Sequence, residues 1–163
     1  MPEPRWRSGI PDLGSKGEGW VALQILLFAA VLATAVWAPG WPRSWRASLV
    51  AGVILLLAGA VLVFAGARSL GSALTPLPYP REGATLRDDG VYRAVRHPIY
   101  GGLMLLSLGV SLCSSPWALM PAALLVLVLV GKTTREEHWL TRWFPEYAAY
   151  RGRVPHRFLP FTW

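Results

Sequence analysis

Residues 88–102 read DDGVYRAVRHPIYGG and continue directly into an apolar run that ends near Ser115. The two acidic residues and the glycine at 88–90 form a turn signal. Pro98 suits the first position of a helix, where no backbone N–H is needed, and it pushes the residue before it out of helical geometry. The stretch therefore predicts a charged turn followed by an apolar helix that begins at Pro98.

Four apolar segments predict an all-α integral membrane protein. Residues 20–38 and 47–67 each hold roughly twenty residues without a charge, enough to cross the hydrocarbon core of a bilayer. Residues 98–115 and 116–131 are shorter and are joined by a Ser-Ser-Pro turn, so we expect a helical hairpin. Only 15% of the chain is charged, against about a quarter in a soluble domain. We therefore expect about four transmembrane helices.

The charge distribution predicts three regions and one orientation. We expect a flexible lead-in over residues 1–19, two transmembrane helices over 20–73, and a C-terminal unit over 74–163, made of the hairpin 98–131 and an interfacial, arginine-rich tail. Basic residues gather in the lead-in, before the hairpin and in the tail, so the positive-inside rule places both termini on the cytoplasmic face. The arginine-rich, lysine-poor composition favours a bacterial source, and hence the bacterial cytoplasmic membrane.

Composition also limits the partners and cofactors. The net charge of +7 does not indicate a nucleic-acid partner, because the basic residues bracket apolar runs and do not form one stripe. The single cysteine, Cys113, excludes a disulfide within the chain. His97, His138 and His156 lie far apart, with no His-x-x-x-His or Cys-x-x-Cys pattern, so no metal site is predicted.

The turn before Pro98 is the first candidate site. The free N–H groups and the positive dipole end of the predicted helix face Arg96 and His97, an arrangement that favours an anion such as a carboxylate or phosphate. Gly101 and Gly102 leave one face of the first turn bare, for a ligand or for a neighbouring helix. From spacing alone, a turn that anchors to lipid headgroups accounts for the arginines as well.

A second polar cluster, residues 132–138, follows the fourth apolar run. Carboxylates this close to a membrane are costly unless they are solvated or paired. Glu136 and Glu137 therefore either balance the neighbouring basic residues or accept hydrogen bonds from ribose hydroxyls or an ammonium group. The aromatic residues that come next, Phe144, Tyr147 and Tyr150, are more typical of membrane anchoring or packing than of a ligand site.

Together, these clusters resemble two motifs of the isoprenylcysteine carboxyl methyltransferase family, integral-membrane enzymes that transfer a methyl group from S-adenosylmethionine to a lipid-soluble acceptor. The first motif is matched by Gly90, Tyr92, Arg96, His97, Pro98, Tyr100 and Gly102. The second motif is matched by Glu136, Glu137, Leu140, Phe144, Tyr147, Tyr150, Arg153, Val154 and Pro155. The similarity extends over residues 84–161, nearly half of the chain.

The resemblance implies that residues 74–163 form a methyltransferase core in which the hairpin and the tail enclose S-adenosylmethionine. The residues that it assigns to this cofactor are Ala84, Thr85, Leu86, Arg87, Tyr92, Arg96, His97, Pro98, Ile99, Tyr100, Gly102, Glu136 and Glu137. It also implies that Lys132, which stands where the eukaryotic members carry an arginine, faces the acceptor. Lysine lacks the planar fork of arginine that suits a carboxylate, so this departure leaves the acceptor open.

Several functions remain compatible with these residues. The acceptor is a prenylated cysteine, a phospholipid amine, a small thiol or an isoprenoid acid, and the bilayer itself is the second expected partner. A nicotinamide-dependent membrane reductase of the sterol reductase type is an alternative, with arginines before the hairpin and in the tail binding the extra phosphate. A non-catalytic membrane module that binds lipid is another. The sequence does not predict an oligomeric state.

Overall fold

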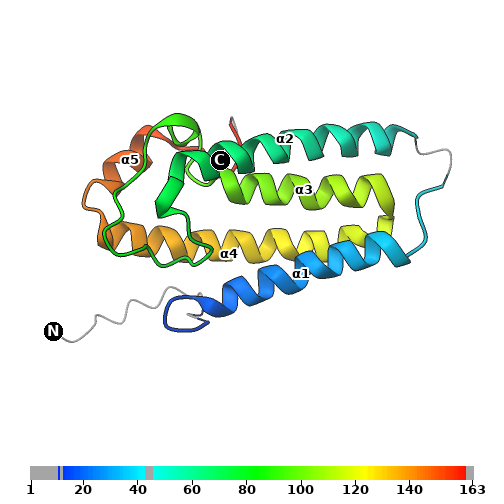
Figure 1. The fold of residues 1–163 in the computed structure, drawn as a ribbon, viewed down its shortest axis with the longest axis horizontal. Coiled ribbons are helices and arrows are strands. Elements are labelled where there is room, and N and C mark those ends of the chain that lie inside the picture. Colours follow the sequence, from blue (N-terminus) through cyan, green and yellow to red (C-terminus); the bar gives the residue numbers. More distant parts are fainter. Residues whose placement is uncertain (1–10, 12, 43–45, 161–163) are drawn as a thin grey trace.

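The computed structural model describes residues 11, 13–42 and 46–160, and all the regular structure in these residues is helical (Figure 1). The long helices are α1 (Glu18–Trp37), α2 (Arg46–Leu70), α3 (Pro98–Ser114) and α4 (Leu119–Trp143), and a short helix α5 (Tyr147–Arg153) follows. Three single turns, η1 (Gly71–Ala73), η2 (Gly90–Arg93) and η3 (Pro116–Ala118), lie between them.

The four long helices alternate in direction along a bundle (Figure 1). The start of α1, the end of α2, the start of α3 and the end of α4 therefore meet at the same end of the molecule, together with α5. We call this the α5 end. The long segment between α2 and α3 also lies there, so most of the polar sequence is gathered at one end. Part of the expected lead-in, residues 1–10 and 12, is outside the described residues, as is the end of the tail at 161–163.

The expectation of an all-α integral membrane protein is confirmed. Within the described residues, three segments are long and apolar enough to cross a membrane by length and composition, namely Glu18–Trp37, Ala47–Ala73 and Pro116–Trp143. Helix α3 is apolar but shorter, with 17 residues. Large apolar side chains such as Ile25, Phe64 and Met120 lie on the outside of the bundle, where lipid replaces water as the solvent.

Helix α4 is longer than the sequence analysis predicted. The hairpin was expected to end at Gly131, before an interfacial tail, but one helix runs from Leu119 to Trp143. A lone glycine costs a helix only about 1 kcal/mol and does not end it, and Gly131 leaves room for the ring of Trp20 from α1. The polar cluster 132–138 therefore lies on a rigid continuation of a membrane helix.

Helices α2 and α3 are the most closely packed pair in the described chain. A Cβ atom built on Gly59 would lie 2.7 Å from the carbonyl oxygen of Gly102, and the reverse distance is also 2.7 Å. Gly52 and Gly109 face each other in the same way at 2.9 Å. In a bilayer the hydrophobic effect does not drive helices together, so close van der Waals packing of this kind stabilises the helix pair.

The substitution Gly59→Leu is expected to destabilise the bundle by about 1–3 kcal/mol, because the new side chain meets a backbone carbonyl that cannot move aside. Thermal unfolding of the protein in detergent measures this effect. Gly152→Ala in α5 is the control, since no atom lies within 4 Å of its new Cβ and alanine favours a helix. Equal unfolding midpoints for the two variants would contradict the tight contact between α2 and α3.

Candidate functional site

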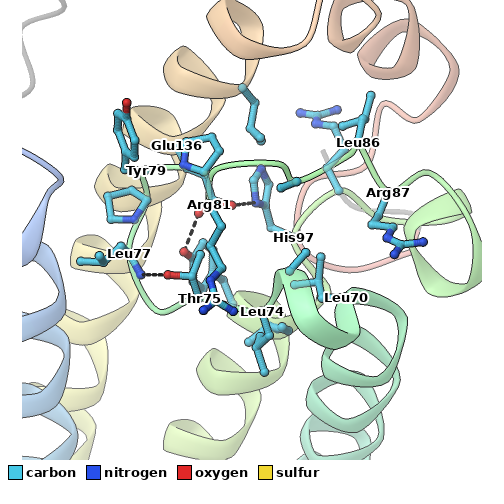
Figure 2. A pocket seen from close by; sticks show the side chains of 18 of the residues that line it. Leu70, Leu74, Thr75, Leu77, Tyr79, Arg81, Leu86, Arg87, His97 and Glu136 are labelled. Carbon is cyan, nitrogen blue, oxygen red and sulfur yellow. Dashed lines mark hydrogen bonds and ion pairs between the residues drawn. The ribbon is translucent and has the colours of Figure 1, made fainter.

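A cavity of about 360 Å³ lies at the α5 end (Figure 2), within the size range of small-molecule sites. Side chains from the long helices, α5 and the segment between α2 and α3 surround it. The lining residues are Gln24, Leu70, residues 73–81, residues 84–87, Tyr92, Arg96, His97, Ile99, Tyr100, Leu103, Lys132, Glu136, Leu140, Phe144, Tyr147 and Tyr150. The cavity is thus bordered by both polar clusters that the sequence analysis singled out.

The wall formed by residues 74–80 is irregular and non-helical because Pro76, Pro78 and Pro80 prevent helix formation. The ring of Tyr79, in this wall, packs edge-on against the ring of Trp139, with 5.0 Å between the ring centroids. This contact holds the wall against α4. In Figure 2, Leu77 and Tyr79 lie on one side of His97, and Leu86 and Arg87 lie on the other. The sequence analysis did not assign this segment to the site.

Three side chains connect the start of α3 to α4 inside the cavity. The hydroxyl of Tyr100 donates a hydrogen bond of 2.5 Å to Oε2 of Glu136. Nδ1 of His97 lies 3.9 Å from the other oxygen of the same carboxylate. The rings of His97 and Tyr100 are nearly parallel, with 9° between their planes. Glu136 therefore presents a carboxylate beside the start of α3, the end at which a helix dipole is positive.

The neighbouring carboxylate, Glu137, points to a different environment. It accepts hydrogen bonds from Nε of Arg96 at 3.0 Å and from Nη2 of Arg157 at 3.1 Å. Nε2 of His97 lies 3.1 Å from its Oε1, and because an ionised carboxylate only accepts, this imidazole nitrogen carries the proton. Glu137 does not line the cavity, and its negative charge is balanced by cationic side chains of the protein itself.

The C-terminal tail lies across the start of α3. The backbone N–H groups of Arg96 and His97 donate to the carbonyls of His156 and Arg157 at 3.0 and 2.8 Å. Gly101 lies against the carbonyl of Phe158, with no room for a Cβ. The bare face that the glycines were expected to leave is thus occupied by the tail at Gly101 and by α2 at Gly102.

The aromatic residues of the tail form a buried cluster beside the cavity. Phe144, Tyr147, Tyr150 and Val154 pack together with Ala84, Leu86 and Leu140. The hydroxyl of Tyr150 donates to the carbonyl of Tyr92 at 2.8 Å. These side chains, for which spacing favoured membrane anchoring or packing, pack as expected but also line the cavity.

The hydroxyl of Tyr147 has no partner. In the described part of the chain, it is the one buried side-chain oxygen or nitrogen atom without a hydrogen bond. Burial raises the pKa of Tyr147, so its phenol stays protonated and able to donate. An unsatisfied buried polar group is unfavourable, and this one belongs to a residue that lines the cavity. Tyr147 therefore carries an unsatisfied hydrogen-bond donor beside the cavity.

The structure places most of the expected site residues around one cavity. Those that line it are Ala84, Thr85, Leu86, Arg87, Tyr92, Arg96, His97, Ile99, Tyr100, Lys132 and Glu136. Pro98, Gly102 and Glu137 do not line it. The sequence analysis missed Gln24, the wall 73–81 and Tyr147. A proline-rich segment directly after a membrane helix was the available signal for the wall.

The comparison with known families agrees with this geometry. Residues 47–147, more than half of the chain, match the model of the phospholipid methyltransferase family. The chain belongs to this family. The matched residues include both polar clusters and most of the cavity wall but not α1.

A curated relative points to one branch of related enzymes. The chain is 31% identical over 129 residues to protein-S-isoprenylcysteine O-methyltransferase B of Arabidopsis thaliana. The alignment covers 76% of this chain and 65% of the relative, so the chain spans slightly less than two thirds of that protein. The resemblance to isoprenylcysteine methyltransferases that the motifs indicated is thus confirmed.

Proposed function

We propose that this protein is a multi-pass membrane methyltransferase that transfers a methyl group from S-adenosylmethionine to a lipophilic acceptor, the carboxylate of an isoprenylcysteine or a similar isoprenoid acid. The observation that carries this proposal is the cavity in which His97, Tyr100 and Glu136 meet at the start of α3. The family match and the Arabidopsis relative support it. By the positive-inside rule the cavity opens on the cytoplasmic face, in the cytoplasmic membrane of a bacterium.

The residues of the cavity fit S-adenosylmethionine. Its amino-acid end carries an ammonium and a carboxylate, which suit the Glu136 carboxylate and the positive end of α3 respectively. Its flat purine suits the apolar side chains of Leu86, Leu140 and Phe144. The unpartnered hydroxyl of Tyr147 adds a hydrogen-bonding group beside them. The cavity therefore offers charged and apolar surfaces to the matching ends of the cofactor.

Transfer to a carboxylate needs few catalytic groups. When bound, S-adenosylmethionine would supply an electrophilic methyl group with a neutral thioether as its leaving group, a transfer that releases no proton from a carboxylate acceptor. The chain needs no general base for this step. Its residues hold the two reactants in line, and the wall 74–80 covers the cavity and limits the access of water.

The variant Tyr147→Phe is expected to weaken S-adenosylhomocysteine binding about threefold to tenfold, because it removes a hydrogen bond to the ligand. Its thermal stability should equal or exceed that of the wild type, since the hydroxyl has no protein partner to lose. Tyr150→Phe is the matched control and should lose stability, because it breaks the bond to the carbonyl of Tyr92. Unchanged affinity in Tyr147→Phe would remove this hydroxyl from the ligand site.

Calorimetric titration of the detergent-purified protein with S-adenosylhomocysteine tests the proposed function. We expect saturable binding that His97→Ala abolishes, and no comparable binding of the reduced nicotinamide dinucleotide phosphate. Binding of the dinucleotide alone would support the reductase alternative. Binding of neither compound would indicate a non-catalytic membrane module.

A further inference from the structure

Lys132 is a fully buried cation in the wall of the cavity. Its side chain has 0% exposure, although it lies on a helix that spans the membrane by length and composition. Its ammonium lies 5.0 Å from the centroid of the Tyr100 ring and donates a hydrogen bond of 2.6 Å to a glutamine oxygen. Both partners are uncharged. A buried ammonium group is stable only when a counter-charge is near.

The glutamine is Gln24, on α1. Since the lysine ammonium only donates, the side-chain oxygen of Gln24 faces it. Thr34, also on α1, bonds to Ala30 of its own helix, whereas Gln24 bonds across to α4 and lines the cavity. The pair joins residues 108 positions apart, and α1 lies outside the residues that match the family model.

The nearest carboxylate on the same helix is Glu136, one turn further along α4. It accepts from Tyr100 and approaches His97, and the proposed function assigns it to the ammonium of the cofactor. Among the described residues, no carboxylate forms an ion pair with Lys132. When the cofactor is bound, the best remaining counter-charge for the Lys132 ammonium is therefore a negative charge on the methyl acceptor.

We propose that Gln24 is a positioning residue that holds the Lys132 ammonium on the α1 side of the cavity, where the ammonium binds the carboxylate of a lipophilic acceptor. This inference rests on the proposed function and adds the part played by α1. It also separates the two acceptor classes that the comparisons suggest. A buried cation attracts a carboxylate and repels the protonated amine of an aminophospholipid. The pair therefore selects an acid over an amine.

Binding of two matched probes tests this proposal. The acid is N-acetyl-S-farnesylcysteine, and the neutral probe is its carboxamide; both are titrated into the detergent-purified full-length protein, with and without saturating S-adenosylhomocysteine. We expect the wild type to bind the acid at least about tenfold more tightly than the amide, as a charge-assisted hydrogen bond provides. Phosphatidylethanolamine in mixed micelles should compete with neither probe.

Three variants identify the contribution of Gln24. Gln24→Leu should weaken binding of the acid about fivefold or more and leave binding of the amide unchanged. Gln24→Glu should abolish the preference for the acid, because the new carboxylate pairs with Lys132. Ile25→Ala is the control on the same helix, since its side chain is 63% exposed on the outside of the bundle. In turnover assays, Gln24→Leu should raise KM for the acid more than it lowers kcat.

The outcomes separate this inference from the proposed function. Equal binding of acid and amide by the wild type, failure of the acid to bind, or a full acid preference in Gln24→Leu would each overturn the role of Gln24. Failure of S-adenosylhomocysteine to bind would overturn the proposed function, and the titrations without it would still measure the acid preference. Competition by phosphatidylethanolamine would point to an amine acceptor and contradict the selection of an acid.

Discussion

The variant Glu136→Gln is expected to weaken S-adenosylhomocysteine binding about 30-fold or more, because it removes the negative charge that faces the ammonium of the ligand. The glutamine keeps the shape of the side chain and an oxygen that accepts a hydrogen bond from Tyr100. The loss of affinity therefore measures the contribution of the negative charge. Calorimetric titration of the purified protein measures it.

A truncated ligand shows which end of the molecule Glu136 binds. 5′-Methylthioadenosine has the purine, the ribose and the sulfur but no amino-acid group, so its affinity should be the same in the wild type and in Glu136→Gln. Glu146→Gln removes an exposed carboxylate next to α5 and should change neither affinity. An equal loss for both ligands in Glu136→Gln would contradict the assignment of this carboxylate to the ammonium.

The variant Glu137→Gln is expected to destabilise the protein by about 3–5 kcal/mol, the usual consequence of removing one partner from a buried ionic cluster. Arg96 and His97, whose side chains are 8% and 3% exposed, would lose the charge that compensates them, as would Arg157. For a chain of this size the unfolding midpoint should fall by about 6 °C or more, measured by thermal unfolding in detergent.

An exposed ion pair provides the comparison for Glu137. Asp88 and Arg153 are joined at 2.9 Å, but their side chains are 52% and 62% exposed. Pairs of this kind contribute about 0–1 kcal/mol, so Asp88→Asn should shift the midpoint by only about 4 °C or less. A shift of this small size in Glu137→Gln would show that the buried cluster does not hold the tail.

The sequence predicted those features that local chemistry determines. Pro98 fixes the start of α3, and the Ser-Ser-Pro turn ends it, as expected. The prolines of residues 74–80 kept that segment out of helical structure. The helix that holds the fourth apolar run continues past Gly131 to Trp143, because a single glycine does not stop a helix.

The roles of individual site residues depend on tertiary packing and were less accessible. Glu136 and Glu137 are adjacent in sequence and point about 100° apart around α4, so only the packed structure shows which one faces the cavity. The resemblance assigned Gly102 to the cofactor, but Gly102 lies against α2, the other partner that its small size allowed. Gln24 on α1 and Arg157 in the tail both find their partners on α4, namely Lys132 and Glu137. No local pattern reveals these pairings.

The position of the tail has a consequence for how the protein is made. Residues 154–158 follow α4 in the chain, so they leave the ribosome after every helix of the bundle. Until then Glu137 lacks Arg157, and the backbone groups of Arg96 and His97 lack the carbonyls that fix them. The start of α3 is held in its final geometry only when the last part of the chain has been synthesised. A released chain truncated before Arg157 should therefore contain the helix bundle without an ordered cavity.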